Sequence, residues 1–344
     1  MFVKPEAAPA HFSGTDLSGP HLFSGPYALG TVSAPGQDAF PALVRRAGSV
    51  VDLRRALGDA GLTMLGVMED WARLSVVFAE LADRPSGGDP LVSEFRVHAP
   101  IAPRQVLQSG ANYRRHVIDL HVAHRDGSDG LSEEEARAEA ARIMDRRAAE
   151  DLPYVFMGLP SAITGPFDDV VLPAWADKPD WELELAAVIG RPAYRVPVER
   201  ALEHVAGYTI ANDLTDRATV FRRDMPQIGT DWLRSKNAPG FTPLGPWIVP
   251  ARSIPTPDDL RVTLKLNGEA MQDESTQDMI FSVARLVSYI SETVRLMPGD
   301  LVLTGSPAGN GMHWGRLLRD GDVMDASITG LGAQRTRCVA EVPA

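Results

Sequence analysis

The pattern of hydrophobic and polar positions is clearest in two neighbouring stretches, residues 181–190 and 207–213, where most positions are apolar. Apolar runs of this length, bounded by turn signals, predict buried strands. Side chains alternate between the two faces of a strand, so we expect Glu182 and Glu184 on one face and their apolar neighbours in a core. The second stretch ends at Asp213, and the residues between the two strands predict a helical crossover.

Two helices and a hairpin are predicted in the second half of the chain. Residues 276–296 place their apolar side chains on one stripe, which predicts a helix with that face against the core. Residues 198–206 predict a short helix closed by Gly207. The Asn267-Gly268 pair follows a strand-like run and predicts a tight hairpin turn.

Three parts are predicted along the chain. Residues 1–25 are rich in Pro, Gly, Ser and His without periodicity, and predict an extended arm. Residues 26–95 combine short strands with helical patterns, among them a helix over 65–81, and predict a small N-terminal α+β domain. A turn-rich linker at 84–90 ends this domain, and residues 96–344 make up the larger one.

The larger domain contains a predicted helical insertion around residues 120–151. Ser132 and Glu135 have the spacing of a capping box, and Glu133 can pair with Arg137 one turn later. The helix has little apolar stripe, so we expect solvent on most of its sides. It is either a plain excursion from the fold or a mobile lid over a site.

Composition restricts the class of protein. The 344 residues include 34 Lys and Arg against 45 Asp and Glu, a net charge of −11 that argues against nucleic acid or an anionic membrane as partner. Cys338 is the only cysteine, so no disulfide forms within the chain, which fits a cytoplasmic location. The start lacks a signal-peptide core, and no run approaches the roughly 18 apolar residues that span a membrane.

Three acidic residues on the two strands are candidate metal ligands. Glu182, Glu184 and Asp213 offer hard oxygen ligands with no cysteine or histidine among them, which suits Mg²⁺, Mn²⁺ or Ca²⁺ and suits zinc poorly. A Glu-x-Glu pair is weak evidence by itself, and spacing alone favours a solvated strand face that carries acids. Both interpretations stay open at this point.

A second candidate group lies on a helix predicted to begin near residue 112. His116 and Asp119 are three residues apart and share a face of that helix. A carboxylate beside an imidazole can orient the ring and raise its basicity, as a water-activating base requires. The alternative is an ordinary surface pair. Further along, Arg217 follows the second acidic strand, and Lys236 lies in a predicted loop.

Six short motifs occur in one order along residues 107–340, and together they resemble the fumarylacetoacetate hydrolase family. They are Asn112-Tyr113 with His116; Glu182-Leu183-Glu184 with Ile189-Gly190; Gly207-Tyr208-Thr209-Ile210 with Asn212-Asp213; Lys236 with Pro243-Leu244-Gly245-Pro246; Asn267-Gly268-Glu269 with Gln272 and Met279-Ile280-Phe281; and Pro298-Gly299-Asp300 with Thr304-Gly305-Ser306-Pro307-Ala308-Gly309. The resemblance over residues 27–90 is fainter.

The resemblance implies a mixed β-roll with flanking helices, usually dimeric, that holds a divalent metal on carboxylates. It implies Glu182, Glu184 and Asp213 as ligands of Mg²⁺ or Mn²⁺, with Ca²⁺ as a further candidate. The other implied site residues are His116 with Asp119 as a base dyad, Lys236 as a cationic stabiliser, and Tyr113, Arg217, Gly305 and Ser306 as substrate contacts.

The activity that the resemblance implies is hydrolysis of a carbon–carbon bond in a small anionic 1,3-diketo acid such as an acylpyruvate. Alternatives on the same metal site are an oxaloacetate-type decarboxylase and an isomerase or tautomerase of 2-hydroxy-diene-dioate acids. A non-catalytic relative that binds small molecules is the alternative of another class. The implied partners are the substrate and a second copy of the chain, without nucleic acid or membrane.

The chain departs from the pattern of the family in a longer segment at 120–151, in the Asn-Ala-Pro that follows Lys236, and at three single positions. Asp119 stands where simpler members usually carry Glu, Ser306 replaces the usual Thr, and Val220 stands where a glutamine often binds substrate. These changes spare the implied metal ligands. We therefore expect retained metal chemistry with an altered substrate, bulkier and less polar near Val220.

Overall fold

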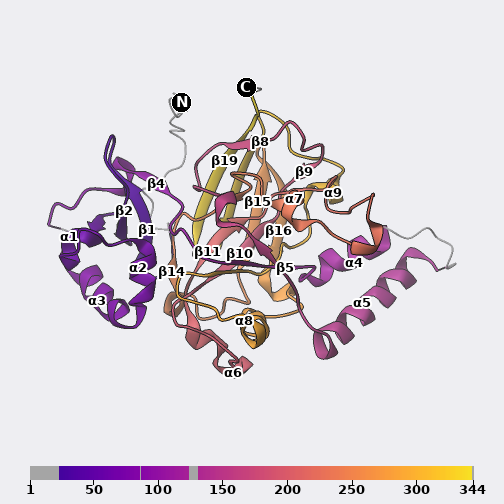
Figure 1. Cartoon of the computed structure of the whole chain (residues 1–344), viewed down its shortest axis with the longest axis horizontal. Helices are drawn as coiled ribbons and strands as arrows, with labels where there is room; N and C mark the ends of the chain where they lie inside the picture. The colour runs from indigo at the N-terminus through magenta and orange to yellow at the C-terminus, as the bar shows by residue number, and fades with distance from the viewer. Residues whose placement is uncertain (1–22, 86, 124–130, 343–344) are drawn as a thin grey trace.

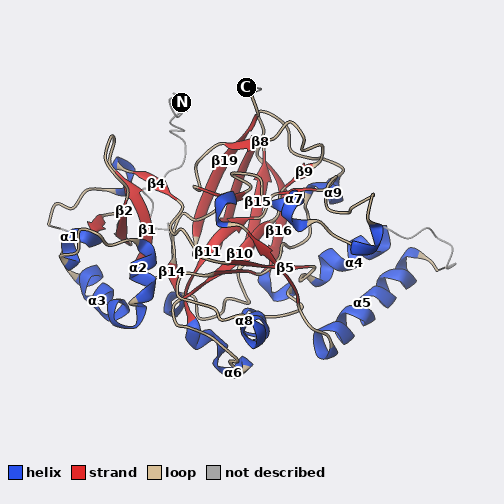
Figure 2. Ribbon diagram, viewed as in Figure 1, coloured by secondary structure: helices blue, strands red, loops and turns tan. Residues whose placement is uncertain are grey.

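The computed structural model describes residues 23–85, 87–123 and 131–342, whose arrangement is shown in Figures 1 and 2. The fold is mixed α+β, as predicted: two large mixed sheets lie at the centre, with a smaller sheet and its helices on one side and a helical pair on the other. The predicted arm lies almost entirely outside the described residues. None of the helices within the described ranges is long and apolar enough to cross a membrane.

The smaller sheet has the strand order β3-β2-β1-β4 with antiparallel neighbours. Its elements and those beside it are β1 (Tyr27–Ser33), β2 (Phe40–Arg45), β3 (Val50–Asp52), α1 (Leu53–Leu57), α2 (Met64–Glu69), α3 (Trp71–Asp83), η1 (Val92–Glu94) and β4 (Arg96–His98). The helix predicted over 65–81 is broken at Asp70, which serves as the N-cap of α3. β4 follows residue 95, the predicted domain boundary, yet pairs with β1; the division into domains stays a prediction.

The two large sheets contain most of the core. The six-stranded sheet, in the order β14-β11-β10-β17-β5-β6, consists of β5 (Val106–Gly110), β6 (Tyr154–Gly158), β10 (Leu183–Ile189), β11 (Val205–Asn212), β14 (Val249–Pro250) and β17 (Leu301–Leu303). The five-stranded sheet, in the order β16-β15-β18-β19-β8, consists of β8 (Val170–Leu172), β15 (Arg261–Leu266), β16 (Glu269–Ser275), β18 (Val323–Ile328) and β19 (Gly332–Ala340). Leu185 of β10 and Leu264 of β15 belong to one buried cluster, so the sheets share a core.

Short elements connect these sheets. They are the strand pairs β7 (Ile163–Thr164) with β13 (Thr242–Pro243) and β9 (Pro179–Asp180) with β12 (Thr215–Asp216), the helices α6 (Val198–Ala201), α7 (Trp232–Lys236), α8 (Val283–Thr293) and α9 (Gly311–Trp314), and the 3-10 turns η2 (Pro160–Ala162), η3 (Leu202–His204), η4 (Pro226–Ile228), η5 (Ala251–Ser253) and η6 (Thr276–Asp278).

The connection between β10 and β11 differs from the predicted helical crossover. The two strands are antiparallel, with Leu183 opposite Asn212, and residues 190–204 between them hold only α6 and η3. Gly207, the predicted helix cap, lies inside β11. A Cβ there would lie 2.4 Å from the carbonyl oxygen of Val249, so the glycine allows β14 to approach β11 closely.

The helix predicted over 276–296 is shorter than expected. The turn η6 comes first, and α8 begins after Ser282, whose Oγ accepts a hydrogen bond from the backbone N–H of Arg285 at 3.2 Å. This cap fixes the start of the helix. The apolar stripe itself is buried as predicted, including Val283, Val287 and Ile290.

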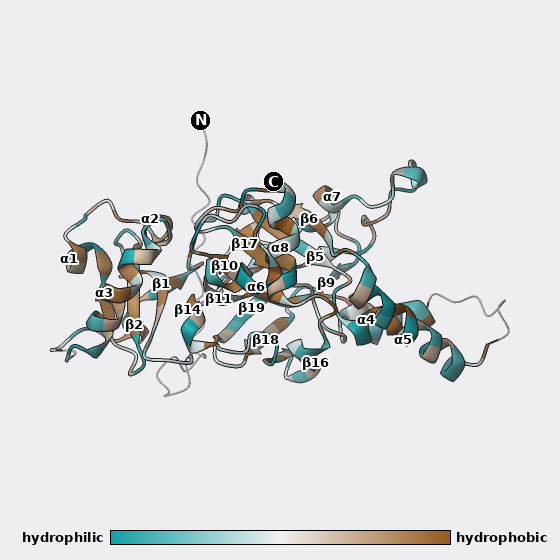
Figure 3. Ribbon diagram, turned by 90° about the horizontal axis from the view of Figure 1, so that it is seen from below, coloured by the Kyte–Doolittle hydropathy of each residue, from teal (hydrophilic) through white to brown (hydrophobic). Residues whose placement is uncertain are grey.

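The helical pair consists of α4 (Arg114–Ala123) and α5 (Glu133–Glu150), which lie side by side in Figures 1 and 3. The predicted capping box is confirmed, because the backbone N–H of Glu135 donates to Ser132 Oγ at 3.2 Å and that of Ser132 donates to Glu135 Oε2 at 2.8 Å. A small apolar cluster joins the helices through Ile118, Ala140 and Met144. The lid interpretation stays a prediction, and residues 124–130 lie outside the described residues.

Candidate metal centre

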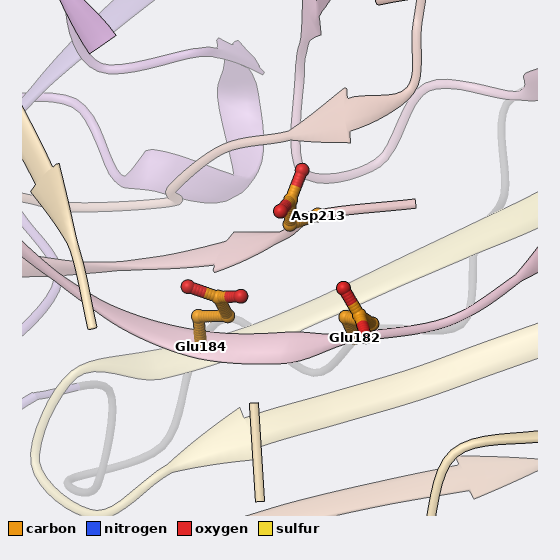
Figure 4. A group of neighbouring side chains, drawn as sticks. All are labelled: Glu182, Glu184 and Asp213. Carbon is orange, nitrogen blue, oxygen red and sulfur yellow. The ribbon is translucent and has the colours of Figure 1, made fainter. Parts of the chain in front are cut away.

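Three carboxylates converge where β10 and β11 lie side by side, and Figure 4 shows their side chains. Glu182 immediately precedes β10, Glu184 lies on it, and Asp213 immediately follows β11. The antiparallel register brings these strand ends together, and the backbone N–H of Asp213 donates to the carbonyl of Glu182 at 2.8 Å. One oxygen of each side chain lies within 4.8 Å of the others.

All three acids are buried, so the solvated strand face favoured by spacing alone is wrong. Glu182 is 9% exposed, Glu184 2% and Asp213 1%. Burial raises the pKa of Glu184 well above its ordinary value, and the nearby charge of Asp213 raises it further. Burial likewise raises the pKa of Asp213. These carboxylates would be stabilised in their charged form by an additional cation.

Lys236 already supplies one cation to the cluster. It lies at the end of α7 rather than in the predicted loop, and its side chain is buried. Its Nζ donates to Glu182 Oε2 at 2.7 Å, to Asp213 Oδ2, and to Thr215 Oγ1 at 2.7 Å. Burial alone would lower the pKa of Lys236, but the surrounding carboxylates outweigh it, so the ammonium group stays charged.

Arg217 supplies a second cation, and its partners are acids of the cluster. Its Nη2 donates to Glu182 Oε1 at 2.7 Å and its Nε donates to Asp180 Oδ2 at 2.9 Å. Burial alone would raise the pKa of Glu182, but Arg217 and Lys236 hold it below its ordinary value. Arg217 therefore orients a candidate ligand, and the predicted contact with substrate stays untested.

The charges of this cluster fit a divalent cation. Asp180 adds a fourth buried carboxylate to the three that converge. Within the described part of the chain, Lys236 and Arg217 form the ion pairs that offset two of these four negative charges. A hard ion with two positive charges would offset the other two, and the donors are all oxygen. The three converging acids are therefore suited to hold such an ion.

Two neutral donors orient the acids further. The backbone N–H of Gly305 donates to Glu184 Oε2 at 2.7 Å, and Gln108 Nε2 donates to Asp213 Oδ1 at 2.7 Å. Gly305 has a φ of 88°, and a Cβ there would lie 3.0 Å from the carbonyl oxygen of Ser109, so glycine permits the approach. Contacts of this kind fix the orientation of metal ligands.

The predicted base lies on α4 next to this cluster. Burial lowers the pKa of His116 to about 4, although the charges of Glu182 and Asp119 act in the opposite direction. The imidazole is therefore neutral at pH 7 and able to accept a proton. The carboxylate of Asp119 accepts a hydrogen bond from Arg137 at 2.6 Å. Within the described residues no hydrogen bond joins Asp119 to His116, so the carboxylate acts on the ring through its charge.

The remaining predicted contacts lie on loops beside the acids. Ser306 Oγ accepts a hydrogen bond from Gln272 Nε2 at 2.9 Å. Tyr113 is fully buried, and burial raises the pKa of its hydroxyl, which stays protonated. The neighbouring Asn112 holds the loop in place, because its Nδ2 donates to the carbonyl of Thr304 at 2.8 Å. Contact of Tyr113 or Ser306 with substrate stays a prediction.

Three residues of the cluster were missed from the sequence: Asp180, Gln108 and Thr215. Asp180 directly precedes the core residue Trp181, and Gln108 is a polar residue within a buried strand. The amide of Gln108 inside an apolar run was a usable signal, because a buried polar group requires a partner, whereas Asp180 follows charged residues and carried a weaker one. Thr215 carried no such signal.

Comparison with known proteins identifies relatives of this chain. A family model described as fumarylacetoacetate (FAA) hydrolase C-terminal matches residues 105–339. A 2,4-didehydro-3-deoxy-L-rhamnonate hydrolase of Sphingomonas sp. (strain SKA58) is 42% identical over 186 residues, which cover 53% of this chain and 64%, less than two thirds, of that protein. The mitochondrial oxaloacetate tautomerase FAHD2A of Bos taurus is 32% identical over 93% of this chain and 88% of that protein. A fumarylacetoacetate hydrolase structure from the psychrophile Exiguobacterium antarcticum matches with a TM-score of 0.70 at 29% identity, over 92% of this chain and 100% of that chain.

Proposed function

The chain belongs to the fumarylacetoacetate hydrolase family, and from this premise we propose that it is a divalent-metal-dependent hydrolase that cleaves a carbon–carbon bond of a small anionic 1,3-diketo acid. The observation that carries the proposal is the buried cluster of three converging acids with Lys236 bonded to two of them. Burying several charges lowers the free energy of unfolding, and a function at the site is the usual reason why a protein retains them.

The proposed metal is Mg²⁺ or Mn²⁺. Three carboxylates without nitrogen or sulfur donors favour hard cations, and a small number of protein ligands leaves positions for substrate oxygens. Ca²⁺ takes more oxygen ligands and is the weaker candidate. When bound, the ion supplies Lewis-acid chemistry that polarises carbonyl oxygens and orients a chelating diketo acid.

His116 is the proposed base. Its neutral imidazole takes a proton from water, and the resulting hydroxide adds to the carbonyl carbon farther from the substrate carboxylate. The bond from that carbon to the central carbon then breaks, and its electron pair remains on the central carbon as an enolate. Protonation of the enolate completes the reaction, which consumes one water and yields two carboxylic acids.

Lys236 is the proposed stabiliser of the negative charge that develops on the enolate. Its ammonium group is held in place by three hydrogen bonds to side chains of the cluster, so little reorganisation is needed when charge appears. A preorganised cation at such a position typically contributes several kcal/mol to the lowering of the barrier.

Tautomerisation of an oxaloacetate-like acid is the second candidate function. It is favoured by the bovine oxaloacetate tautomerase, which aligns with 93% of this chain. Such a reaction moves one proton between carbon and oxygen and consumes no water. The same base and the same stabilised enolate would serve it, so the two functions differ in whether hydroxide attacks a carbonyl.

A screen of diketo acids and oxaloacetate with Mg²⁺ or Mn²⁺ tests the proposal. We expect the enol absorbance of a 1,3-diketo acid to fall while two acids appear in equal amounts by chromatography. Loss of enol absorbance without acid release would support the tautomerase, and release of CO₂ a decarboxylase. No change with any of these substrates, while the metal binds, would support the non-catalytic alternative.

A further inference from the structure

Three aromatic side chains form a cluster beside Lys236, two of them in contact with its ammonium group and the third packed on those two. They are Tyr154 and Phe156 of β6 and Trp232 of α7, which we call the aromatic surface. Phe156 and Trp232 are stacked, with ring centroids 4.6 Å apart and an interplanar angle of 16°. Lys236 Nζ lies 5.7 Å from the centroid of Phe156 and 5.8 Å from that of Trp232. The same ammonium group therefore touches both the acids and the rings.

The order of strands places the aromatic surface on the same face of the sheet as the acids. Phe156 pairs with Gln108 across β5 and β6, and directly paired residues project to one face. Gln108 in turn donates to Asp213 at 2.7 Å. One face of the sheet thus runs from the acids past Gln108 to the rings.

A glycine makes room for the rings over this face. Tyr154 pairs with Gly110 of β5, and a Cβ at Gly110 would lie 3.0 Å from Tyr154 Cδ1 and 3.4 Å from Phe156 Cε1. The rings are not sealed in a core, because Tyr154 is 43% exposed and Phe156 is only partly buried. Open apolar rings beside a buried charged cluster are typical of a ligand-binding surface.

The polar atoms of the aromatic surface are bonded within it. Trp232 Nε1 donates to the hydroxyl of Tyr154 at 2.6 Å, and that hydroxyl lies 3.3 Å from Thr230 Oγ1. The surface therefore offers ring faces rather than free donors. Ring faces carry partial negative charge, so they favour a flat apolar group and disfavour a carboxylate. Without free donors, the surface offers no hydrogen bonds to the hydroxyl groups of a sugar.

We propose that the aromatic surface binds the part of the substrate beyond the reacting carbonyls and selects an acid that ends in a flat apolar group, such as a phenyl ring or conjugated chain. This proposal rests on the proposed function, because it assumes that the two carbonyls of the substrate bind at the acids. The rings then stack on the flat apolar group at the far end of the substrate. A polyhydroxylated or dicarboxylic substrate has no such group.

The first test compares 2,4-dioxo-4-phenylbutanoate with 2,4-dioxopentanoate as substrates. We expect kcat/KM to be about tenfold higher for the phenyl compound, near the upper end of what one aromatic contact contributes. Trp232→Ala should bring the ratio near one, and Trp232→Phe should keep most of it because the ring remains. Trp175→Ala removes an exposed tryptophan elsewhere and should leave the ratio unchanged. An unchanged ratio in Trp232→Ala, with circular dichroism of a folded protein, would overturn the proposal.

The second test separates this proposal from the proposed function. Phenylpyruvate and pyruvate lack the second carbonyl, so their binding can be measured by calorimetry without cleavage. We expect phenylpyruvate to bind about tenfold more tightly, and Trp232→Ala or Tyr154→Ala to remove the difference. If no diketo acid is cleaved but this preference holds, the hydrolase assignment fails and the aromatic surface stands. Equal binding of the two acids by the wild type would reject the aromatic surface even if cleavage occurs.

Discussion

The two ends of strand β10 are both buried but differ in what fills the space around them. At one end Val188 and Ile189 are fully buried among apolar side chains. At the other end Glu182 and Glu184 are buried among charges, with Lys236 and a guanidinium as counter-ions. One strand of seven residues thus contains both a region that stabilises the fold and a region that does not.

The difference indicates where selection for function has acted. Burying apolar surface is favourable at about 25 cal/mol per Å², whereas burying a charge costs several kcal/mol unless partners offset it. At the charged end, two negative charges have no counter-ion within the described residues. Apolar side chains of similar size would avoid the cost of burying those charges. Substitutions at the two ends should therefore have opposite effects on stability and on activity, and the predictions below test this contrast.

The largest effect is expected from Glu184→Ala at the charged end. The remaining acids should no longer hold the metal, and activity should fall by about 10³-fold or more because the Lewis acid is lost. The metal-free protein should be as stable as the wild type or more so, because a repelling carboxylate is gone. Metal content by mass spectrometry and thermal unfolding with and without Mg²⁺ measure both. Retained stoichiometric metal would contradict the ligand assignment.

A smaller loss of activity is expected from His116→Ala. The change should lower kcat by about 10²- to 10⁴-fold, as for loss of a general base, and leave metal content unchanged. In the wild type the base is lost only when the imidazole is protonated. Because burial lowers its pKa to about 4, activity should fall as the pH drops through about 4 rather than through 6.5. A pH–rate profile for kcat/KM measures this, and an acid limb near 6.5 would contradict a base whose pKa is lowered.

The apolar end of β10 should respond in the opposite way. Ile189→Ala leaves a cavity in a fully buried position and should cost about 2–5 kcal/mol of unfolding free energy. Metal content and kcat of the folded enzyme should stay close to those of the wild type. Urea unfolding gives the free energy, and activity is compared at a temperature where both proteins are folded. A change in metal affinity larger than the loss of stability would show that the two ends are coupled.

Local features could be predicted from the sequence because they depend on neighbouring residues. The Asn267-Gly268 hairpin is one, since both residues have positive φ, and the capping box at Ser132 is another. Alternation on a strand likewise placed Glu182 and Glu184 together. The meeting of these acids with Asp213 followed from the ends of two apolar runs. The helix expected between the strands is present as α6 and η3, but it joins antiparallel neighbours and is not a crossover.

Contacts that depend on strand order could not be predicted in this way. Gln108 reaches Asp213 from a strand 105 positions earlier, and only the pairing of β17 with β10 and β5 brings them together. The break at Asp70 and the start of α8 at Ser282 lie at capping residues, which apolar periodicity does not report. Periodicity predicts which face of a helix is buried more reliably than where the helix begins.

The smallest effect is expected from Arg137→Ala, which tests how α5 acts on the charged end through α4. Arg137 donates to Asp119 at 2.6 Å, and its positive charge offsets the carboxylate that raises the pKa of His116. Its removal should move the acid limb of the pH–rate profile upward and cost at most about 1 kcal/mol of stability, as for an exposed ion pair. Asp119→Asn should move the limb downward, because the negative charge itself is lost. Glu133→Gln is the matched control, since it weakens the other ion pair of Arg137 and leaves Asp119 bound. If Arg137→Ala and Glu133→Gln shift the limb equally, α5 acts on His116 through packing and not through the charge of Asp119.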